Sequence, residues 1–378
     1  MGRKKPQLLT LACDTGLSLT KGIGSSGGQI LPLVMSPDTI EQCSATLDSY
    51  RCQVGSDLLH RSFVGVNGVY LALGSLAQRS GATQTLKPLK SETIVYKILA
   101  AVSIMAQRFN LGTSFDLDLG CLLPPGEFAN CEGIRQSLTL ALADFDTPIG
   151  VFNVNLKSCN IYVEGMGVVT LQQTNQRQTL GTGVTLMAGH RNITFYTTEF
   201  GTISGMETCD LGFNQWAKAV RAKTYDYDLR DLAPVIASYW LKRDEKALDQ
   251  ILRHRSPELR QSELDLLIKT IELACLDYCG SIFKWLDEHL PQRIDELFVA
   301  GGAGDVLQAE LFEYFHDRMN PHPQYNGQGA IFKSTSFNLP ILDVPAEYQS
   351  RMADVYCLWK YVMPQPVVKA STTAKAKT

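Results

Sequence analysis

The hydrophobic pattern of the first half of the chain predicts a hairpin and a later strand. An apolar run at residues 8–13 is typical of a buried strand. A turn at Gly16 leads from it into returning strand segments at residues 21–34. Between residues 115 and 123, hydrophobic residues first alternate with acids and then form an apolar run that two prolines end. We therefore expect a hairpin that opens a domain, and a strand that reaches a loop.

A helix is expected between these strands because residues 94–105 are apolar nearly all round, which is typical of a buried helix. Ser91 is its predicted N-cap, and Gly112 lies just past its end. The rest of this half predicts a short helix at residues 134–142 and strands at 151–156, 160–163 and 168–172. The polar run at residues 172–183 has no apolar periodicity, and we place a hinge there.

The second half begins with the same pattern as the first. An apolar strand at residues 184–187, a turn at Gly189 and a returning strand at residues 193–196 predict a second hairpin. Gly201 and another strand-like segment follow it. Two hairpins of similar construction, one near the start of each half, indicate an internal duplication.

The remaining pattern predicts mostly helices. Ser256 as N-cap and Pro257 at the first helical position begin an apolar pattern that runs to about residue 286. A strand at residues 296–300 ends in the glycines of GGAGDVL, and a helix is expected at residues 306–315.

Length and composition narrow the class of protein. A chain of 378 residues exceeds the size of one ordinary core, so we expect two domains of comparable size. The net charge of −3 favours no direct binding of nucleic acid. The ten cysteines show no zinc-ligand spacing, and Cys275 and Cys279 are expected on one helix face as reduced thiols. Apolar runs are too short for a signal peptide or a membrane span, so we expect a cytoplasmic protein with no membrane contact.

Three glycine turns carry the pieces of a phosphate-binding site. In DTGLSLTK, Asp14 offers a carboxylate for a hydrated divalent cation, Gly16 allows close backbone approach, and Lys21 offers a cation for phosphates. The second turn is MAGHRNIT at residues 187–194, again between two strands. The third, VAGGAGDVL at residues 299–307, runs from a strand into a helix N-terminus, where a ribose or phosphate can lie against bare backbone. Each turn alone is equally typical of ordinary turn chemistry or packing.

The order of these turns resembles the actin, Hsp70 and sugar-kinase superfamily, and the spacing of Asp14 to Lys21 matches the first phosphate loop of actin. More narrowly, the chain resembles the bacterial and archaeal ParM-type actins. Four short motifs carry this resemblance: YLALGSLA at residues 70–77, LLPPGEF at 122–128, YVEGMG at 162–167 and GHRNIT at 189–194. The resemblance covers residues 8–363.

The resemblance implies an α/β, actin-like fold in which two RNase H-like domains close around a nucleotide cleft. Domain I would comprise residues 1–178 and domain II residues 179–345. Residues 346–363 would return to domain I. Residues 364–378 hold three lysines and no acid, and we expect a disordered tail.

The resemblance also implies the cofactors, ATP and Mg²⁺, and the residues that bind them. Asp14 would hold the metal through water. The expected nucleotide contacts are Asp14, Thr15, Gly16 and Lys21 from the first turn, Gly189 and His190 from the second, and Gly301 and Gly302 beside the adenosine. Glu164 matches the position from which family members orient the attacking water, and its alternative is a solvated acid in a turn.

The second turn departs from the family pattern, which is Asp-x-Gly. Met187 stands in place of the acid, and a thioether is a poor partner for Mg²⁺, which prefers oxygen ligands. Hydrolysis is therefore expected to be slow or absent. His190 and Arg191 are expected to have a surface role, with charge supplied near the phosphates as the alternative, and Glu127 and Glu132 are expected to be structural.

Three functions stay open on these grounds. The leading one is a weak ATPase that polymerises into filaments with ATP bound and serves plasmid or other DNA segregation. Its partners would be further copies of itself and an adaptor protein that binds the DNA. The second is a small-molecule kinase of the same fold, because fold alone does not fix function. The third is a nucleotide-binding scaffold without hydrolysis, which Met187 favours.

Overall fold

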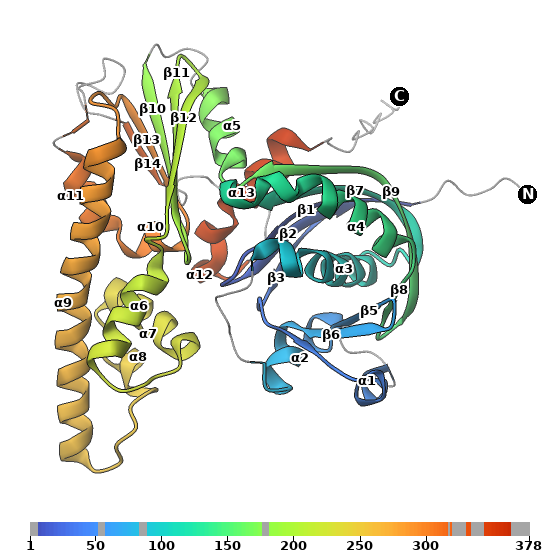
Figure 1. Cartoon of the computed structure of the whole chain (residues 1–378), viewed down its shortest axis with the longest axis horizontal. Helices are drawn as coiled ribbons and strands as arrows, with labels where there is room; N and C mark the ends of the chain where they lie inside the picture. The colour runs from blue at the N-terminus through green and yellow to red at the C-terminus, as the bar shows by residue number, and fades with distance from the viewer. Residues whose placement is uncertain are drawn as a thin grey trace, which may run out of the picture.

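The computed structural model contains two separate β-sheets, one in each half of the molecule, with helices packed against them (Figure 1). It describes residues 7–51, 57–82, 89–175, 181–316, 318–319, 330–333 and 344–363. The predicted tail at residues 364–378 and the middle of the predicted hinge, residues 176–180, lie outside the described residues.

The larger sheet has nine strands in the order β3-β2-β1-β7-β9-β8-β5-β6-β4. These are β1 Leu8–Thr15, β2 Thr20–Ser26, β3 Gln29–Met35, β4 Thr39–Glu41, β5 Phe63–Val66, β6 Val69–Leu73, β7 Ser114–Leu123, β8 Phe145–Thr147 and β9 Gly150–Val163. The predicted opening hairpin is confirmed, because β1 pairs antiparallel with β2. One continuous strand, β9, replaces the two predicted at residues 151–156 and 160–163. Lys157 is an extra residue in the pairing with β7, and this bulge breaks the alternation without ending the strand.

The smaller sheet has five strands in the order β12-β11-β10-β13-β14. These are β10 Thr182–Ala188, β11 Ile193–Glu199, β12 Thr202–Cys209, β13 Glu296–Ala300 and β14 Ala330–Lys333. The second predicted hairpin is therefore confirmed, as is the late strand that ends in glycines.

The two sheets share one topology. In each, three consecutive strands form an antiparallel meander, and the first of the three pairs in parallel with a later strand, which pairs in parallel with another. The larger sheet extends this pattern beyond β9 by four strands. This shared order supports the internal duplication that the two hairpins indicate.

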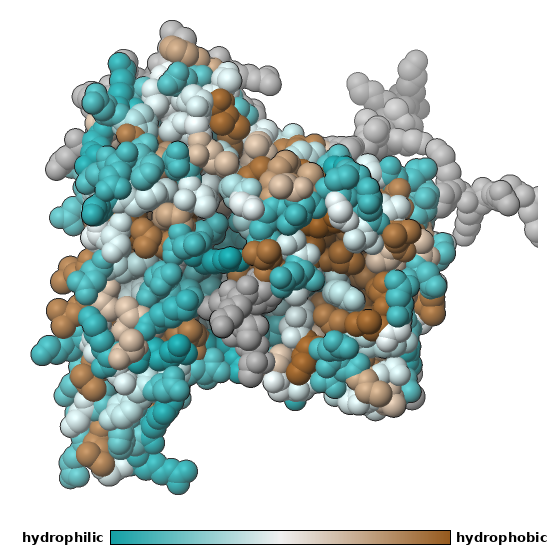
Figure 2. All heavy atoms as spheres, in the orientation of Figure 1, coloured by the Kyte–Doolittle hydropathy of each residue, from teal (hydrophilic) through white to brown (hydrophobic). Residues whose placement is uncertain are grey.

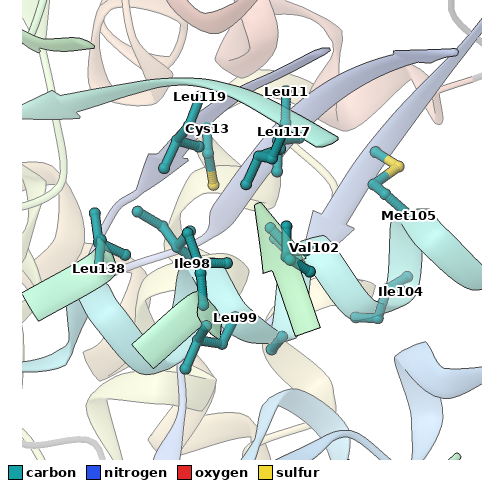
Figure 3. Close-up of a cluster of buried hydrophobic side chains, with 14 of the residues drawn as sticks. Leu11, Cys13, Ile98, Leu99, Val102, Ile104, Met105, Leu117, Leu119 and Leu138 are labelled. Atoms are coloured by element: carbon teal, nitrogen blue, oxygen red, sulfur yellow. The ribbon is translucent and has the colours of Figure 1, made fainter. Parts of the chain in front are cut away.

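Helices of the first half pack on the larger sheet. They are α1 Ser44–Arg51, α2 Gly74–Arg79, α3 Lys90–Arg108 and α4 Cys131–Ala143, whereas α5 Met166–Asn175 packs on β10 and β13 of the smaller sheet. As predicted, α3 is buried on most sides, and its Ile98 and Val102 lie in one cluster with Leu11 of β1 and Leu117 of β7 (Figure 3). Full burial of a side chain of this size stabilises the fold by about 1.5–3 kcal/mol. This cluster therefore fixes α3 under the strands whose ends carry the first glycine turn.

The segment at residues 168–172, predicted as a strand, is part of helix α5. The β-branched residues Val168, Val169 and Thr170 favour a strand locally. The helix forms because Gly165, at φ +91°, ends the preceding strand, and the carboxylate of Asp354 accepts hydrogen bonds at the helix start. The first residues of the predicted hinge, up to residue 175, are helical as well.

Helices of the second half form one buried cluster with the smaller sheet. They are α6 Phe213–Lys223, α7 Leu229–Lys242, α8 Lys246–Asp249, α9 Pro257–His289, α10 Gly302–Val306 and α11 Gln308–His316. Ser256 caps α9 as predicted. Trp216 is fully buried, stacks on Tyr278 and donates its indole N–H to the carbonyl oxygen of Ile271 at 3.1 Å, which fixes α6 on α9. The predicted pair Cys275 and Cys279 is buried on α9 as free thiols.

The outer face of α9 carries exposed leucines. Hydrophobic side chains appear at intervals along the edge of the molecule that α9 occupies (Figure 2). The exposed leucines of this helix are Leu259, Leu266, Leu273 and Leu276. Within the part of the chain that the structure describes, no helix is both long and apolar enough to cross a membrane.

The last described segment returns to the larger sheet. It consists of α12 Ala346–Gln349, a 3₁₀ turn at Ser350–Met352, α13 Ala353–Cys357 and a π-helical turn at Leu358–Val362. Its apolar side chains form one buried cluster with Ala12 of β1, Ile23 of β2 and Leu122 of β7. The segment thereby lies beside the strand ends that carry the first glycine turn.

Candidate functional site

A cleft of about 1160 Å³ lies where the carboxyl ends of β1, β10 and β13 meet, and residues from both halves of the chain line it. Eight of the nine predicted site residues lie on its wall: Asp14, Gly16, Lys21, Glu164, Gly189, His190, Gly301 and Gly302. The ninth, Thr15, is fully buried, and its hydroxyl has no hydrogen-bond partner among the described residues. The three glycine turns, far apart in sequence, therefore face one cavity.

The first turn joins β1 to β2. Asp14 and Lys21 are directly paired across this hairpin, and the Lys21 ammonium lies 2.5 Å from Oδ2 of Asp14. A side chain at Gly16 would approach the carbonyl oxygen of Leu19 to 2.9 Å, which is too close for any Cβ. The turn therefore needs glycine at this position, and the Asp-x-Gly spacing has a steric cause.

Lys90, which the sequence analysis missed, completes an ion-pair chain in the cleft. It is the first residue of α3 and only 2% exposed. Its ammonium lies 2.6 Å from Oδ1 of Asp14 and 2.7 Å from Oε1 of Glu164. A cation at a helix N-terminus opposes the helix dipole, and this was the available sequence signal. Lys90 links the first turn to the residue predicted to orient the attacking water.

The charged groups of this ion-pair chain shift one another's pKa values. Burial alone would raise the pKa of Asp14, but the ion pairs with Lys21 and Lys90 outweigh burial and hold that pKa far below its ordinary value. Burial alone would lower the pKa of Lys90, but Asp14 and Glu164 raise it well above its ordinary value. Both groups are therefore charged at neutral pH.

Glu127 caps the start of α3, where the sequence analysis expected Ser91 to do so. Its two carboxylate oxygens accept hydrogen bonds from the backbone N–H groups of Lys90 at 3.1 Å and Ser91 at 2.7 Å. The residue before the helix, Leu89, contributes no side-chain cap. The prediction of Ser91 as N-cap is therefore wrong, because a distant carboxylate satisfies the helix N-terminus. The expected structural role of Glu127 is confirmed by these contacts.

Glu164 is held in place by its backbone neighbours. Its N–H donates to the carbonyl oxygen of Leu123 at 2.8 Å, and its carbonyl oxygen accepts from the hydroxyl of Tyr196. The next residue, Gly165, donates its N–H to buried Asp354 at 2.7 Å. Burial raises the pKa of Asp354 to about 6, against the opposing effect of the Gly165 hydrogen bond. Glu164 therefore lies in the turn after β9 with a fixed backbone and with its carboxylate paired with Lys90, and its role in orienting the attacking water stays a prediction.

The second turn lies opposite the first. Gly189 donates its N–H to the carbonyl oxygen of Asn192 at 2.9 Å and lines the cleft with His190. Burial and, more weakly, the cation of Arg351 lower the pKa of His190 to about 4. Arg191 reaches the other half of the chain, with its guanidinium 3.8 Å from Glu127.

The third turn is shaped by backbone contact. Gly301 has φ +93°, and a Cβ there would overlap the carbonyl oxygen of Ala188. Helix α10 begins at Gly302, closer to the glycines than predicted. Arg351, also missed by the sequence analysis, lies beside Gly302 and donates to the hydroxyl of Ser18 at 2.7 Å. This arginine joins the first and third turns.

Met187 faces the cleft at the position where the resemblance implies a second carboxylate. It lies at the end of β10, and its Cγ would be 3.1 Å from a Cβ at Gly165. Asp14, the remaining acid, has both oxygens in ion pairs with lysines. These residues do not fit a magnesium site built from two carboxylates, because a thioether is a poor partner for a hard cation or its waters. Asp14 as a metal ligand stays a prediction.

Comparison with solved structures finds the same fold in known proteins. An archaeal actin homolog, Ta0583, in complex with ADP matches 93% of this chain and 99% of its own at 15% identity, with a TM-score of 0.57. Bacillus thuringiensis ParM with ATP matches 93% and 98% at 12% identity and 0.55. AlfA from a B. subtilis plasmid, solved as a filament, matches 93% and 98% at 11% identity and 0.51.

The chain has an actin-like fold. The resemblance to ParM-type actins inferred from short motifs is thereby confirmed at the level of the fold, as is the α/β class. No protein-family model matches the chain, and no curated protein sequence matches it. Identities this low show the fold of this actin-like chain, while its ligand and assembly are matters for proposal.

Proposed function

We propose that this chain binds ATP in the cleft between its two sheets and polymerises into filaments. The convergence of three glycine turns on one cavity carries this proposal. Neighbours of the same fold support it, since they were solved with ADP, with ATP or as a filament. Lys21 and the backbone of Gly16, Gly189 and Gly301 would contact the nucleotide.

We further propose weak ATP hydrolysis coupled to polymerisation. Glu164 lines the cleft on a backbone fixed by Leu123, Tyr196 and Asp354, which suits a carboxylate that orients a water molecule. Asp14 is the carboxylate predicted to meet a hydrated Mg²⁺. No second carboxylate faces it from the end of β10, so we expect a slow reaction.

The cellular role we propose is plasmid or DNA segregation in the cytoplasm. Further copies of the chain would be its main partner, and an adaptor protein would bind the DNA. The net charge of −3 supports indirect contact with DNA. The cysteines among the described residues are free thiols, which suits a reducing compartment.

Sedimentation with ATP, with ADP and without nucleotide tests the proposal. We expect polymer in the pellet with ATP and less without nucleotide. Polymer under none of these conditions would refute filament formation. Binding of ATP without polymer, but with transfer of phosphate to a sugar, would favour the small-molecule kinase. Polymer with ATP but no phosphate release would favour the non-hydrolysing scaffold, the alternative that Met187 keeps open.

A further inference from the structure

The inference concerns the buried lysine in the ion-pair chain. The ammonium of Lys90 bridges the carboxylates of Asp14 and Glu164 at 2.6 and 2.7 Å, and the residue lines the cleft. Lys21 takes the other oxygen of Asp14. The acids on this wall are thus already neutralised by the protein's own cations.

These pairs set the charge at one part of the cleft wall. Two lysines cancel the two carboxylates of Asp14 and Glu164, while the rest of the lining carries further acids and cations, among them Asp354 and Arg351. A site with an acid in place of Met187 would be one unit more negative. The added charge would weaken the attraction for a polyphosphate unless a divalent cation intervened, because like charges repel.

We propose that Lys90 supplies, at this site, the positive charge that a divalent cation supplies between paired carboxylates, so that nucleotide affinity depends little on Mg²⁺. This inference rests on the proposed binding of nucleotide in the cleft. It deepens that proposal, because it states which group neutralises the acids that would face the phosphates. Met187 and Lys90 act in the same direction. Met187 replaces the acid that would need a metal ion, and Lys90 neutralises the two acids that are present.

The test is the affinity for a fluorescent adenine nucleotide in excess Mg²⁺ and in excess EDTA. For the unaltered chain we expect the two dissociation constants to agree within about three-fold. Lys90→Met should weaken binding in EDTA by about ten-fold or more, because it leaves the wall with an unpaired negative charge. Lys246→Met, at an exposed residue of α8, is the matched control and should bind as the unaltered chain does.

The reciprocal variant restores the acid. Met187→Asp should weaken binding in EDTA by about ten-fold or more and regain it in Mg²⁺. Met206→Asp adds the same charge on the exposed strand β12 and should change neither value. Lys90→Met removes a buried ion-pair partner from Asp14 and Glu164, so circular dichroism checks its folding. If it unfolds, Met187→Asp decides.

The outcomes separate the inference from the proposal beneath it. Binding by the unaltered chain that weakens more than about ten-fold in EDTA would overturn the inference and leave nucleotide binding intact. A Met187→Asp variant that binds equally with and without Mg²⁺ would also overturn it. No binding of nucleotide under either condition would refute the proposed function, and this inference with it.

Discussion

His190 makes the stability of the fold depend on pH in a direction that the structure fixes. The ring lies in the cleft near Phe213, and burial, with Arg351 and Lys218 adding smaller effects, lowers its pKa from 6.5 to about 4. The native state therefore binds fewer protons than the unfolded chain between these two values. The stability that depends on neutral His190 is complete above pH 6.5 and is lost as the pH falls through 4.

The expected size follows from the same two values. At about pH 5, an unfolded histidine is almost fully protonated, whereas the native one is mostly neutral. The linkage relation then gives a loss of about 2 kcal/mol relative to about pH 7.5. His190→Gln has a side chain of similar size that does not titrate, so it should escape this loss.

The assay is urea unfolding of the unaltered chain and of His190→Gln at both pH values. Other titrating groups act in both proteins, so their effects cancel in the difference between the two free energies of unfolding. That difference should shift by about 2 kcal/mol in favour of the variant on going to the lower pH. His289→Gln, at the exposed end of α9, controls for loss of a surface histidine. An unchanged difference would show that His190 is not held neutral by burial.

Three further substitutions test the turns and the residues that support them. Gly301→Ala should lower the free energy of unfolding by about 3 kcal/mol or more, because its Cβ would overlap Ala188. The control Gly28→Ala, at φ +86° with open space around it, should lower that free energy by about 1 kcal/mol. Equal urea midpoints for the two variants would contradict this. Glu127→Ala leaves two backbone N–H groups at the start of α3 without their acceptor and should lower the free energy of unfolding by about 2 kcal/mol, measured by thermal unfolding. Glu127→Gln should lower it less. An unchanged melting temperature would contradict the capping role of Glu127. Glu164→Ala should slow phosphate release by about ten- to hundred-fold while polymer still pellets, and unchanged release would remove Glu164 from the reaction.

Local pattern predicted the elements that depend on local interactions. Both hairpins, the strand ending at residue 123, α4 and α9 are where hydrophobic periodicity and turn residues placed them. The glycine turns were also predicted to meet. The structure explains why two of them need glycine: a Cβ at Gly16 would be too close to a carbonyl oxygen, and Gly301 has a positive φ.

The errors share one cause, which is contact between distant residues. Residues 168–172 were predicted as a strand, but they belong to helix α5, whose start is capped by Asp354. Asp354 lies 187 residues from Gly167 in the sequence, so the local pattern does not contain the cap. Ser91 was expected to cap α3, but Glu127 does so from 36 residues away. No local window contains both partners of such a pair, so periodicity cannot predict them.

The missed site residues follow the same rule. Lys90 meets Asp14 across 76 positions, and Arg351 meets Ser18 across 333. By contrast, the sequence predicted that Met187 lies in the site, because a short local motif places it there. The structure shows that Met187 does face the cleft. The domain boundaries and the roles of individual site residues stay predictions.

The return of the last described segment to the first sheet has a consequence for the order of synthesis. Arg351 and Asp354 reach the cleft wall only when residues 344–363 pack against β1, β2 and β7. These residues are synthesised after all strands of both sheets, because they follow β14 in the chain. Any ligand that needs the complete wall can therefore bind only after this segment has been made and has docked on the first sheet.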